Sequence, residues 1–241
     1  NGMRLILSPA ISPTQMTSFA TIRTGANVAL RCLSTITHPL MPELMRFLRQ
    51  RNQEKSESAF ATVWLVVLAL MAPAVLILQA YVEPLFNLWT QGKVPFDPVL
   101  FGLLSGGVLL YAVAQPAMAI VMGNNILGVQ LWISALSAAV VVGLVVLLLP
   151  PMGLRGVGVA LIVSELIAGV GYVWAANYWL KLVGLKWPWR SFCWVLVGVA
   201  IPFCSFVLLA LFPSVRFLIV MSSCFGVVVI AFLYFRTMPP F

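Results

Sequence analysis

The chain is patterned as long apolar runs separated by short polar or proline-containing breaks. Stretches without Asp, Glu, Lys or Arg extend over residues 58–82, 98–154 and 217–235. About 20 helical residues cross the hydrocarbon core of a bilayer, so the middle stretch holds two spans. The pattern predicts strongly apolar membrane helices over residues 58–82, 98–121, 127–149, 156–180, 191–212 and 216–236.

A seventh helix, predicted over residues 14–40, is polar. It carries Arg23, Asn27, Arg31, Ser34 and His38. At about 100° per residue, these five side chains fall within a stripe about 80° wide. An arginine at the middle of a bilayer costs about 2.5–3.5 kcal/mol on insertion scales. We therefore expect this stripe to face protein or a water-filled cavity.

Prolines and charged residues set the expected limits of this helix. Pro39 and Pro42 are expected to end it, because proline lacks the backbone donor that a helix interior needs. Residues 43–57 are the most charged part of the chain and are predicted to form a short amphipathic cytoplasmic segment. Residues 1–13 contain two prolines and are predicted to be a loop.

Further breaks are expected along the rest of the chain. Pro73 predicts a kink, residues 83–97 a loop, and Gly123-Asn124-Asn125 a tight turn. Pro150-Pro151 is expected to end the helix that begins near residue 127. In the 156–180 helix, small residues that favour close helix packing recur every four positions: Gly156, Ala160, Ser164 and Ala168.

Composition agrees with a membrane protein. The 241 residues are 62% hydrophobic and 8% charged, with a mean hydropathy of +1.05, whereas soluble domains average about 25% charged residues. The pattern therefore predicts an all-α, polytopic bundle of about seven spans. Its net charge of +8 does not indicate nucleic-acid binding, because the basic residues are spread over short interhelical loops.

The distribution of basic residues predicts an orientation. Eight lie on the side expected to be cytoplasmic: Arg46, Arg49, Arg51, Lys55, Lys181, Lys186, Arg190 and Arg236. Four lie on the other side: Arg4, Lys93, Arg155 and Arg216. Cytoplasmic loops of membrane proteins carry an excess of lysine and arginine.

The sequence contains no cluster of residues typical of a catalytic or metal-binding site. Cys32, Cys193, Cys204 and Cys224 lie in or beside predicted spans without a CxxC pair, and the chain has one histidine. They are interpreted as small apolar residues. We predict no catalytic site, no metal and no cofactor, and hence a protein that is not an enzyme.

Arg23 and Arg31 are the leading candidates for a functional site. With Asn27 and Ser34 they are predicted to bind an anionic substrate, because guanidinium groups contact phosphate oxygens through two hydrogen bonds. Alternatively, they are structural partners of Glu165, an acid within a predicted span. Glu165 itself is a candidate coupling site for a proton or ion, or a salt-bridge partner.

Three segments together resemble the C-terminal part of polysaccharide or oligosaccharide-lipid flippases, such as O-antigen flippases. These belong to the multidrug/oligosaccharidyl-lipid/polysaccharide exporter superfamily. The segments are residues 11–19 (ISPTQMTSF) with 39–44 (PLMPEL), the Gly123-Asn124-Asn125 turn, and residues 151–160 (PMGLRGVGVA) leading to Ser164-Glu165. Each motif is short, and their order and spacing carry the resemblance.

The resemblance implies a two-lobe alternating-access transporter in a bacterial inner membrane. Residues 1–182 would be the helices of its C-terminal lobe and residues 183–241 two additional helices. The chain would be a fragment, with an N-terminal lobe preceding it. The implied function is translocation of a polyprenyl-pyrophosphate-linked oligosaccharide for cell-surface polysaccharide such as lipopolysaccharide. The implied partners are that lipid-linked oligosaccharide, membrane lipids and the N-terminal lobe. Relatives carry cationic residues in the cavity for the pyrophosphate, which suits Arg23 or Arg31.

Two other functions remain open at this point. A cation-coupled multidrug exporter of the same superfamily would use cavity carboxylates, and Glu165 is the available candidate. A membrane glycan polymerase or ligase would need a large extracytoplasmic loop with catalytic residues, and the longest such loop expected here has about 15 residues, 83–97.

Overall fold

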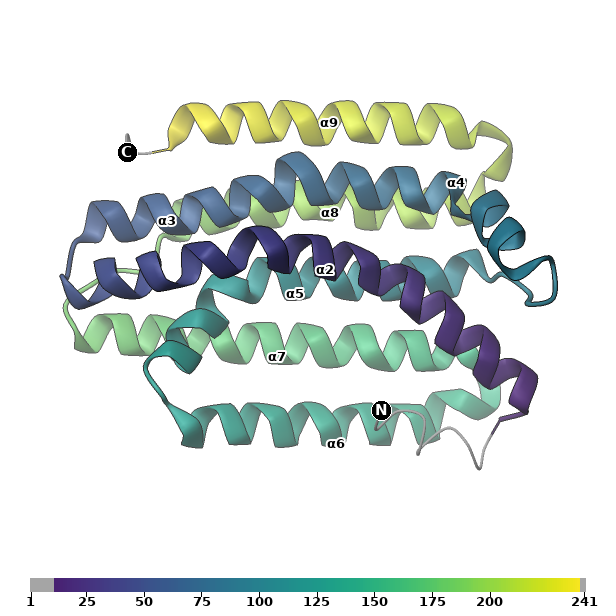
Figure 1. Ribbon diagram of the computed structural model, residues 1–241, viewed down its shortest axis with the longest axis horizontal. Coiled ribbons are helices and arrows are strands. Elements are labelled where there is room, and N and C mark those ends of the chain that lie inside the picture. Colours follow the sequence, from purple (N-terminus) through teal and green to yellow (C-terminus); the bar gives the residue numbers. More distant parts are fainter. Residues whose placement is uncertain (1–10, 239–241) are drawn as a thin grey trace.

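The computed structural model describes residues 11–238 as a bundle of long helices lying side by side (Figure 1), with no strand among these residues. Within that range it leaves out the side chains of Ala29, Cys32, Leu33, Ser34, Ile36, Thr37, His38, Leu40, Ala210 and Pro213. The elements are α2 (Pro13–Arg49), α3 (Gln53–Val66), η1 (Val67–Met71), α4 (Ala72–Thr90), α5 (Pro98–Gly123), α6 (Leu127–Met152), α7 (Leu154–Leu182), α8 (Trp189–Leu211), η2 (Pro213–Val215) and α9 (Arg216–Thr237).

Six helices in the described part of the chain are long and apolar enough to cross a membrane. They are Gln53–Thr90, Pro98–Gly123, Leu127–Met152, Leu154–Leu182, Trp189–Leu209 and Arg216–Thr237. This composition is that of a multi-pass membrane protein. The predicted six strongly apolar spans are confirmed as helices, whereas α2 is not among the six.

Helix α2 is longer than the sequence predicted. Ser12 caps its start, accepting from the Gln15 backbone N–H while the Gln15 side chain accepts from the Ser12 N–H. The helix then runs through Pro39 and Pro42 to Arg49, so the expected end at these prolines is wrong. It continues because Leu44 and Leu48 are buried against the bundle beyond the prolines. The first part of the predicted 43–57 segment is therefore the end of α2. At 1.5 Å per residue, the whole helix is about 55 Å long.

Residues 53–90 form one long helix interrupted by the π-helix η1. The π-helix ends at Met71, two residues before Pro73, where a kink was predicted. Its wider turn accommodates the carbonyl that proline leaves without a donor. The predicted loop over residues 83–97 is too long, because α4 continues to Thr90. The break comes at Gln91, which adopts the left-handed conformation with φ 53°.

Helix α5 lies at the centre of the bundle and packs along α7, which in turn packs along α6. Asn125 forms the predicted tight turn before α6, with φ 56°. Pro150 and Pro151 lie inside α6, so the expected break there is wrong. The chain turns instead at Gly153, whose φ of 58° favours glycine.

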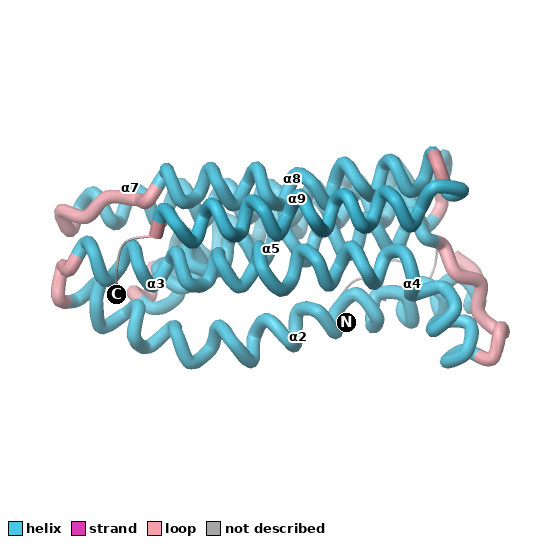
Figure 2. Tube along the Cα trace, turned by 90° about the horizontal axis from the view of Figure 1, so that it is seen from above, coloured by secondary structure: helices cyan, strands magenta, loops and turns pink. Residues whose placement is uncertain are grey.

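The start of α3 and the connection between α7 and α8, which carries the basic residue Lys186, lie at the same end of the bundle. The Gln53 side chain accepts from the Lys186 N–H at 2.9 Å and donates to the Lys186 carbonyl at 3.0 Å. This arrangement agrees with the expectation that both segments lie on one side of a membrane, and that sidedness stays a prediction. Figure 1 also places the C-terminal end of α9 at this end, and Figure 2 shows α2 along one face of the bundle with α8 opposite.

Candidate functional site: the groove between α2 and α5

The N-terminal half of α2 packs on α5 through its apolar face. Phe19, Ile22 and Ala26 are buried in one cluster with Phe101 and Leu104 of α5. Arg23 and Asn27 flank this buried face and are half-buried. The predicted polar stripe of α2 therefore begins at the edge of its contact with α5.

Arg23 and Asn27 line a small cavity of about 140 Å³, together with Tyr111 of α5 and Glu165 of α7. The Arg23 guanidinium lies 5.9 Å from the centre of the Phe19 ring, a distance at which cation–π attraction operates. Three helices thus bring a cation, an amide, a hydroxyl and a carboxyl group to one cavity.

Glu165 reaches this cavity over a glycine of α5. A Cβ atom added at Gly107 would lie 3.8 Å from the Glu165 Cγ, so the acidic side chain passes directly over Gly107. Arg23 and Glu165, both among the described side chains, form no direct ion pair, but the Arg23 charge acts electrostatically on the carboxyl group.

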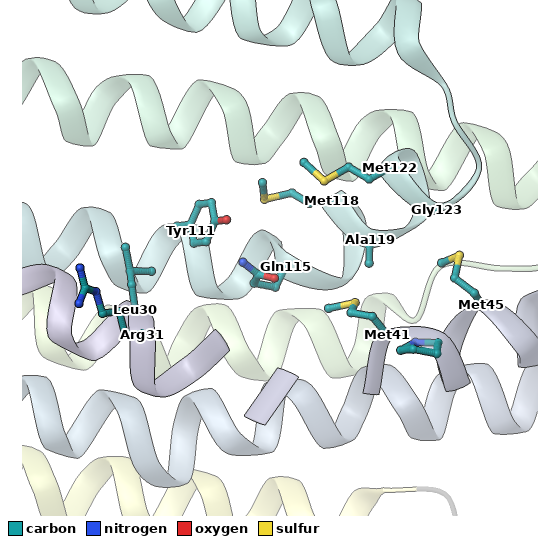
Figure 3. A pocket seen from close by; sticks show the side chains of 11 residues that line it. Leu30, Arg31, Met41, Met45, Tyr111, Gln115, Met118, Ala119, Met122 and Gly123 are labelled. Carbon is teal, nitrogen blue, oxygen red and sulfur yellow. The ribbon is translucent and has the colours of Figure 1, made fainter. Parts of the chain in front are cut away.

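Arg31 lies about one turn beyond Asn27 on α2 and lines a larger cavity of about 670 Å³. Figure 3 shows Arg31 at one end of this cavity and Tyr111 and Gln115 on the α5 wall facing α2. Leu30 and Tyr111 border both cavities, so the two adjoin each other along the contact between α2 and α5. We call this space the α2–α5 groove.

Methionines form the other end of the groove. Two pairs with four-residue spacing face it, Met41 and Met45 from α2, and Met118 and Met122 from α5. At its far end the Met45 sulfur lies directly against Gly123, where a Cβ atom would clash. Methionine side chains are flexible and polarizable, so this section adapts its shape to an apolar occupant.

The structure thus brings most of the predicted site residues to one groove. Arg23 and Asn27 share a cavity with Glu165, and Arg31, which is exposed, lies in the adjoining section. The side chain of Ser34 lies outside the described residues. Sequence reasoning missed Tyr111 and the methionines, although the Met-x₃-Met spacing in two helices is visible in the sequence.

The groove combines an electropositive, hydrogen-bonding section with an apolar one. Guanidinium, amide and phenol groups bind anionic and hydroxyl-rich ligands, and the methionine section suits a hydrocarbon chain. Among the described residues, no group of three or more His, Cys, Asp or Glu side chains is placed to hold a metal ion. Comparison with models of known protein families, with curated proteins and with solved structures finds no match for this chain.

Proposed function

We propose that this chain is part of a membrane transporter that moves a polyprenyl-pyrophosphate-linked oligosaccharide across the bilayer. The observation that carries this proposal is the α2–α5 groove, which places Arg23 and Arg31 in adjoining sections of one space inside an apolar helix bundle. In the proposed mechanism the arginines contact the pyrophosphate, and Asn27 and Tyr111 contact polar groups beside it.

The outer face of α2 supports the further proposal that a second lobe faces this one. Thr17, Thr24 and Thr35 are exposed there, and each hydroxyl donates to the carbonyl four residues earlier. Their donors are satisfied within the helix, so this face is polar without being costly. The exposed Arg31 on the same helix is costly in lipid, which favours a protein or aqueous surface opposite α2. In this proposal α2 is the seventh span.

Arginine substitutions in the full-length protein test the proposal. Arg23→Ala and Arg31→Ala should each lower glycan export per folded molecule about tenfold or more, because a hydrogen bond to a charged group contributes about 1.5–3 kcal/mol. Lysine at either position should restore part of the activity, since it keeps the charge but loses the two-pronged contact. Arg49→Ala is the matched control, because Arg49 ends the same helix, is exposed, and does not line the groove.

Glu165→Gln separates substrate binding from structural pairing. If Arg23 serves only to balance Glu165, the double variant Arg23→Ala/Glu165→Gln should regain both folded yield and export. If Arg23 contacts the substrate, the double variant should fold well and remain inactive. Export equal to that of the natural sequence in the double variant would therefore refute the substrate-binding role.

A cation-coupled exporter is the second candidate, because Glu165 lies beside Arg23 in the smaller cavity. A transport cycle that protonates Glu165 would release Arg23 from its electrostatic partner. For this function, Glu165→Gln alone should abolish pH-dependent efflux of cationic compounds in cells. Unchanged efflux would remove this candidate and leave the flippase proposal in place.

A further inference from the structure

A second pocket lies at the end of the bundle opposite the Gln53–Lys186 contact. It measures about 650 Å³ and is bordered by α4, α5, α7, α8 and the start of α9. Its lining divides into a polar and an apolar part. The polar side chains are Gln79, Glu83, Arg155 and Arg216, and Phe203 and Phe206 contribute aromatic walls.

The polar side chains of this pocket all lie at the level where helices begin or end. Arg155 and Arg216 are the second residue of α7 and the first residue of α9. Gln79 reaches the same level, because its Nε2 donates to the carbonyl of Pro98, the first residue of α5, at 2.8 Å. For helices that span a bilayer, this level is the headgroup region.

Gln79, which lines the pocket, carries a buried acceptor without a partner in the part of the chain that the structure describes. Its Oε1 atom is buried and has no hydrogen-bond partner among the described residues. The bond from Nε2 to Pro98 fixes which end of the amide is the oxygen. The oxygen lies against Gly102, 3.5 Å from the position of an added Cβ atom, and both residues line the pocket. A buried acceptor without a donor costs about 1–3 kcal/mol, so a ligand that donates a hydrogen bond would be favoured here.

The charges of the pocket are divided between its walls. Gln79 and Glu83 are four residues apart on α4 and so share one face of that helix. The two arginines come from α7 and α9. Arg155 uses its Nε for Asp97 at 2.8 Å, and a guanidinium group has four further N–H donors. The α4 residues can thus accept hydrogen bonds, and the arginines of α7 and α9 supply the positive charge of the pocket.

The apolar part extends from this polar region into the bundle. Phe203 lies eight residues before the end of α8 at Leu211, about 12 Å along the helix axis. A ligand that fits both parts has a zwitterionic head and a hydrocarbon chain.

We propose that this pocket binds a phospholipid whose headgroup carries a primary ammonium, as in phosphatidylethanolamine. The phosphate contacts Arg155 and Arg216. The ammonium donates to the Gln79 oxygen and the Glu83 carboxylate. One acyl chain lies along Phe203 and Phe206. This inference is independent of the proposed transport function.

The test compares three phospholipids with identical acyl chains but different headgroups. Purified full-length protein is delipidated and exposed to phosphatidylethanolamine, phosphatidylcholine or phosphatidylglycerol, and lipid retention is measured by native mass spectrometry. The trimethylammonium of phosphatidylcholine has no N–H donor, so the comparison isolates the contact with Gln79 and Glu83. We expect retention of phosphatidylethanolamine to exceed that of phosphatidylcholine about tenfold.

Two variants and a control complete the experiment. Glu83→Gln changes an exposed residue and so leaves folding intact, and it should lower the preference for phosphatidylethanolamine. Arg216→Gln should lower retention of all three lipids, whereas Lys93→Gln, at the same end but outside the pocket, should change none. Equal retention of the three lipids by the unaltered protein, preferential retention of phosphatidylglycerol, or a preference unchanged in Glu83→Gln would each overturn the proposal.

Discussion

Gly156 allows α6 and α7 to approach each other more closely than any residue with a side chain would permit. A Cβ atom added at Gly156 would lie 2.7 Å from the Leu148 carbonyl carbon and 2.9 Å from the Leu148 Cβ of α6. Unbonded carbon atoms pack at about 3.5–4.0 Å, so the helices would have to separate by roughly 1 Å. The atoms that clash belong mainly to the backbone, which has no rotamer available to relieve the contact.

Gly156→Ala should therefore destabilise the protein despite its higher helix propensity. Overpacking typically costs about 1–3 kcal/mol, and replacing a helical glycine with alanine returns up to about 1 kcal/mol. The net expectation is a loss of about 1–2 kcal/mol. Gly143→Ala in α6 is the matched control, because nothing lies within 4 Å of an added Cβ atom there. It should be neutral or stabilising.

Reversible unfolding in mixed micelles of mild detergent and dodecyl sulfate measures both variants. The signal is the fluorescence of the native tryptophans, of which Trp132 is on α6 and Trp174 on α7. The contact between α6 and α7 also includes a hydrogen bond from the Ser164 hydroxyl to the Ser137 carbonyl at 3.1 Å, which should lengthen if the helices separate. Gly156→Ala and Gly143→Ala shifting the unfolding midpoint equally, or both upward, would show that α6 and α7 are not packed as described.

Two further predictions concern the ends of the bundle. The first uses single cysteines introduced into a cysteine-free background. Cysteines that replace Gln50 and Lys181 should react from one side of the membrane, and a cysteine that replaces Lys93 should react from the other. Labelling of the Gln50 and Lys181 positions from opposite sides would contradict the helix order. Asp97 caps α5 by accepting from the Val99 and Leu100 N–H groups and also binds Arg155. Asp97→Asn should lower the free energy of unfolding by less than about 1 kcal/mol, because it loses only an exposed ion pair. Asp97→Ala should lower it by about 1–2 kcal/mol, because it also loses the cap of α5. Equal losses in the same unfolding assay would assign the whole effect to the ion pair.

The membrane helices could be predicted because each apolar run is longer than the apolar runs found in loops or strands. The limits of the helices were less predictable, and α2 shows why. Pro39 and Pro42 were expected to end it, but burial of Leu44 and Leu48 stabilises the helix beyond them. That burial depends on α3 lying alongside, which local sequence does not encode. At Pro150-Pro151 the difference is smaller, because α6 continues only to Met152 before the turn at Gly153.

The candidate site was predictable on α2 alone. The helical period places Arg23, Asn27 and Arg31 on one stripe, because that depends on spacing within one helix. The residues that face this stripe come from α5 and α7, and the sequence alone does not show how these helices lie against α2. Met118 and Met122 count as ordinary apolar residues in a hydropathy pattern, so their role in lining the groove becomes visible only once α2 lies over α5.

The position of α2 on the bundle depends on its polar residues as well as on its apolar face. In a membrane, burying Phe19 and Ile22 against α5 brings no gain from leaving water, because lipid chains are equally apolar. Close packing and polar interactions must then hold α2 in place, and the Arg23 charge acts on Glu165 across the cavity that both side chains line. Arg23 is thus both a candidate ligand for the substrate and a contributor to the structure of its own site. Loss of activity in Arg23→Ala is informative only per folded molecule. The double variant with Glu165→Gln is therefore the measurement that assigns Arg23 to one role or the other.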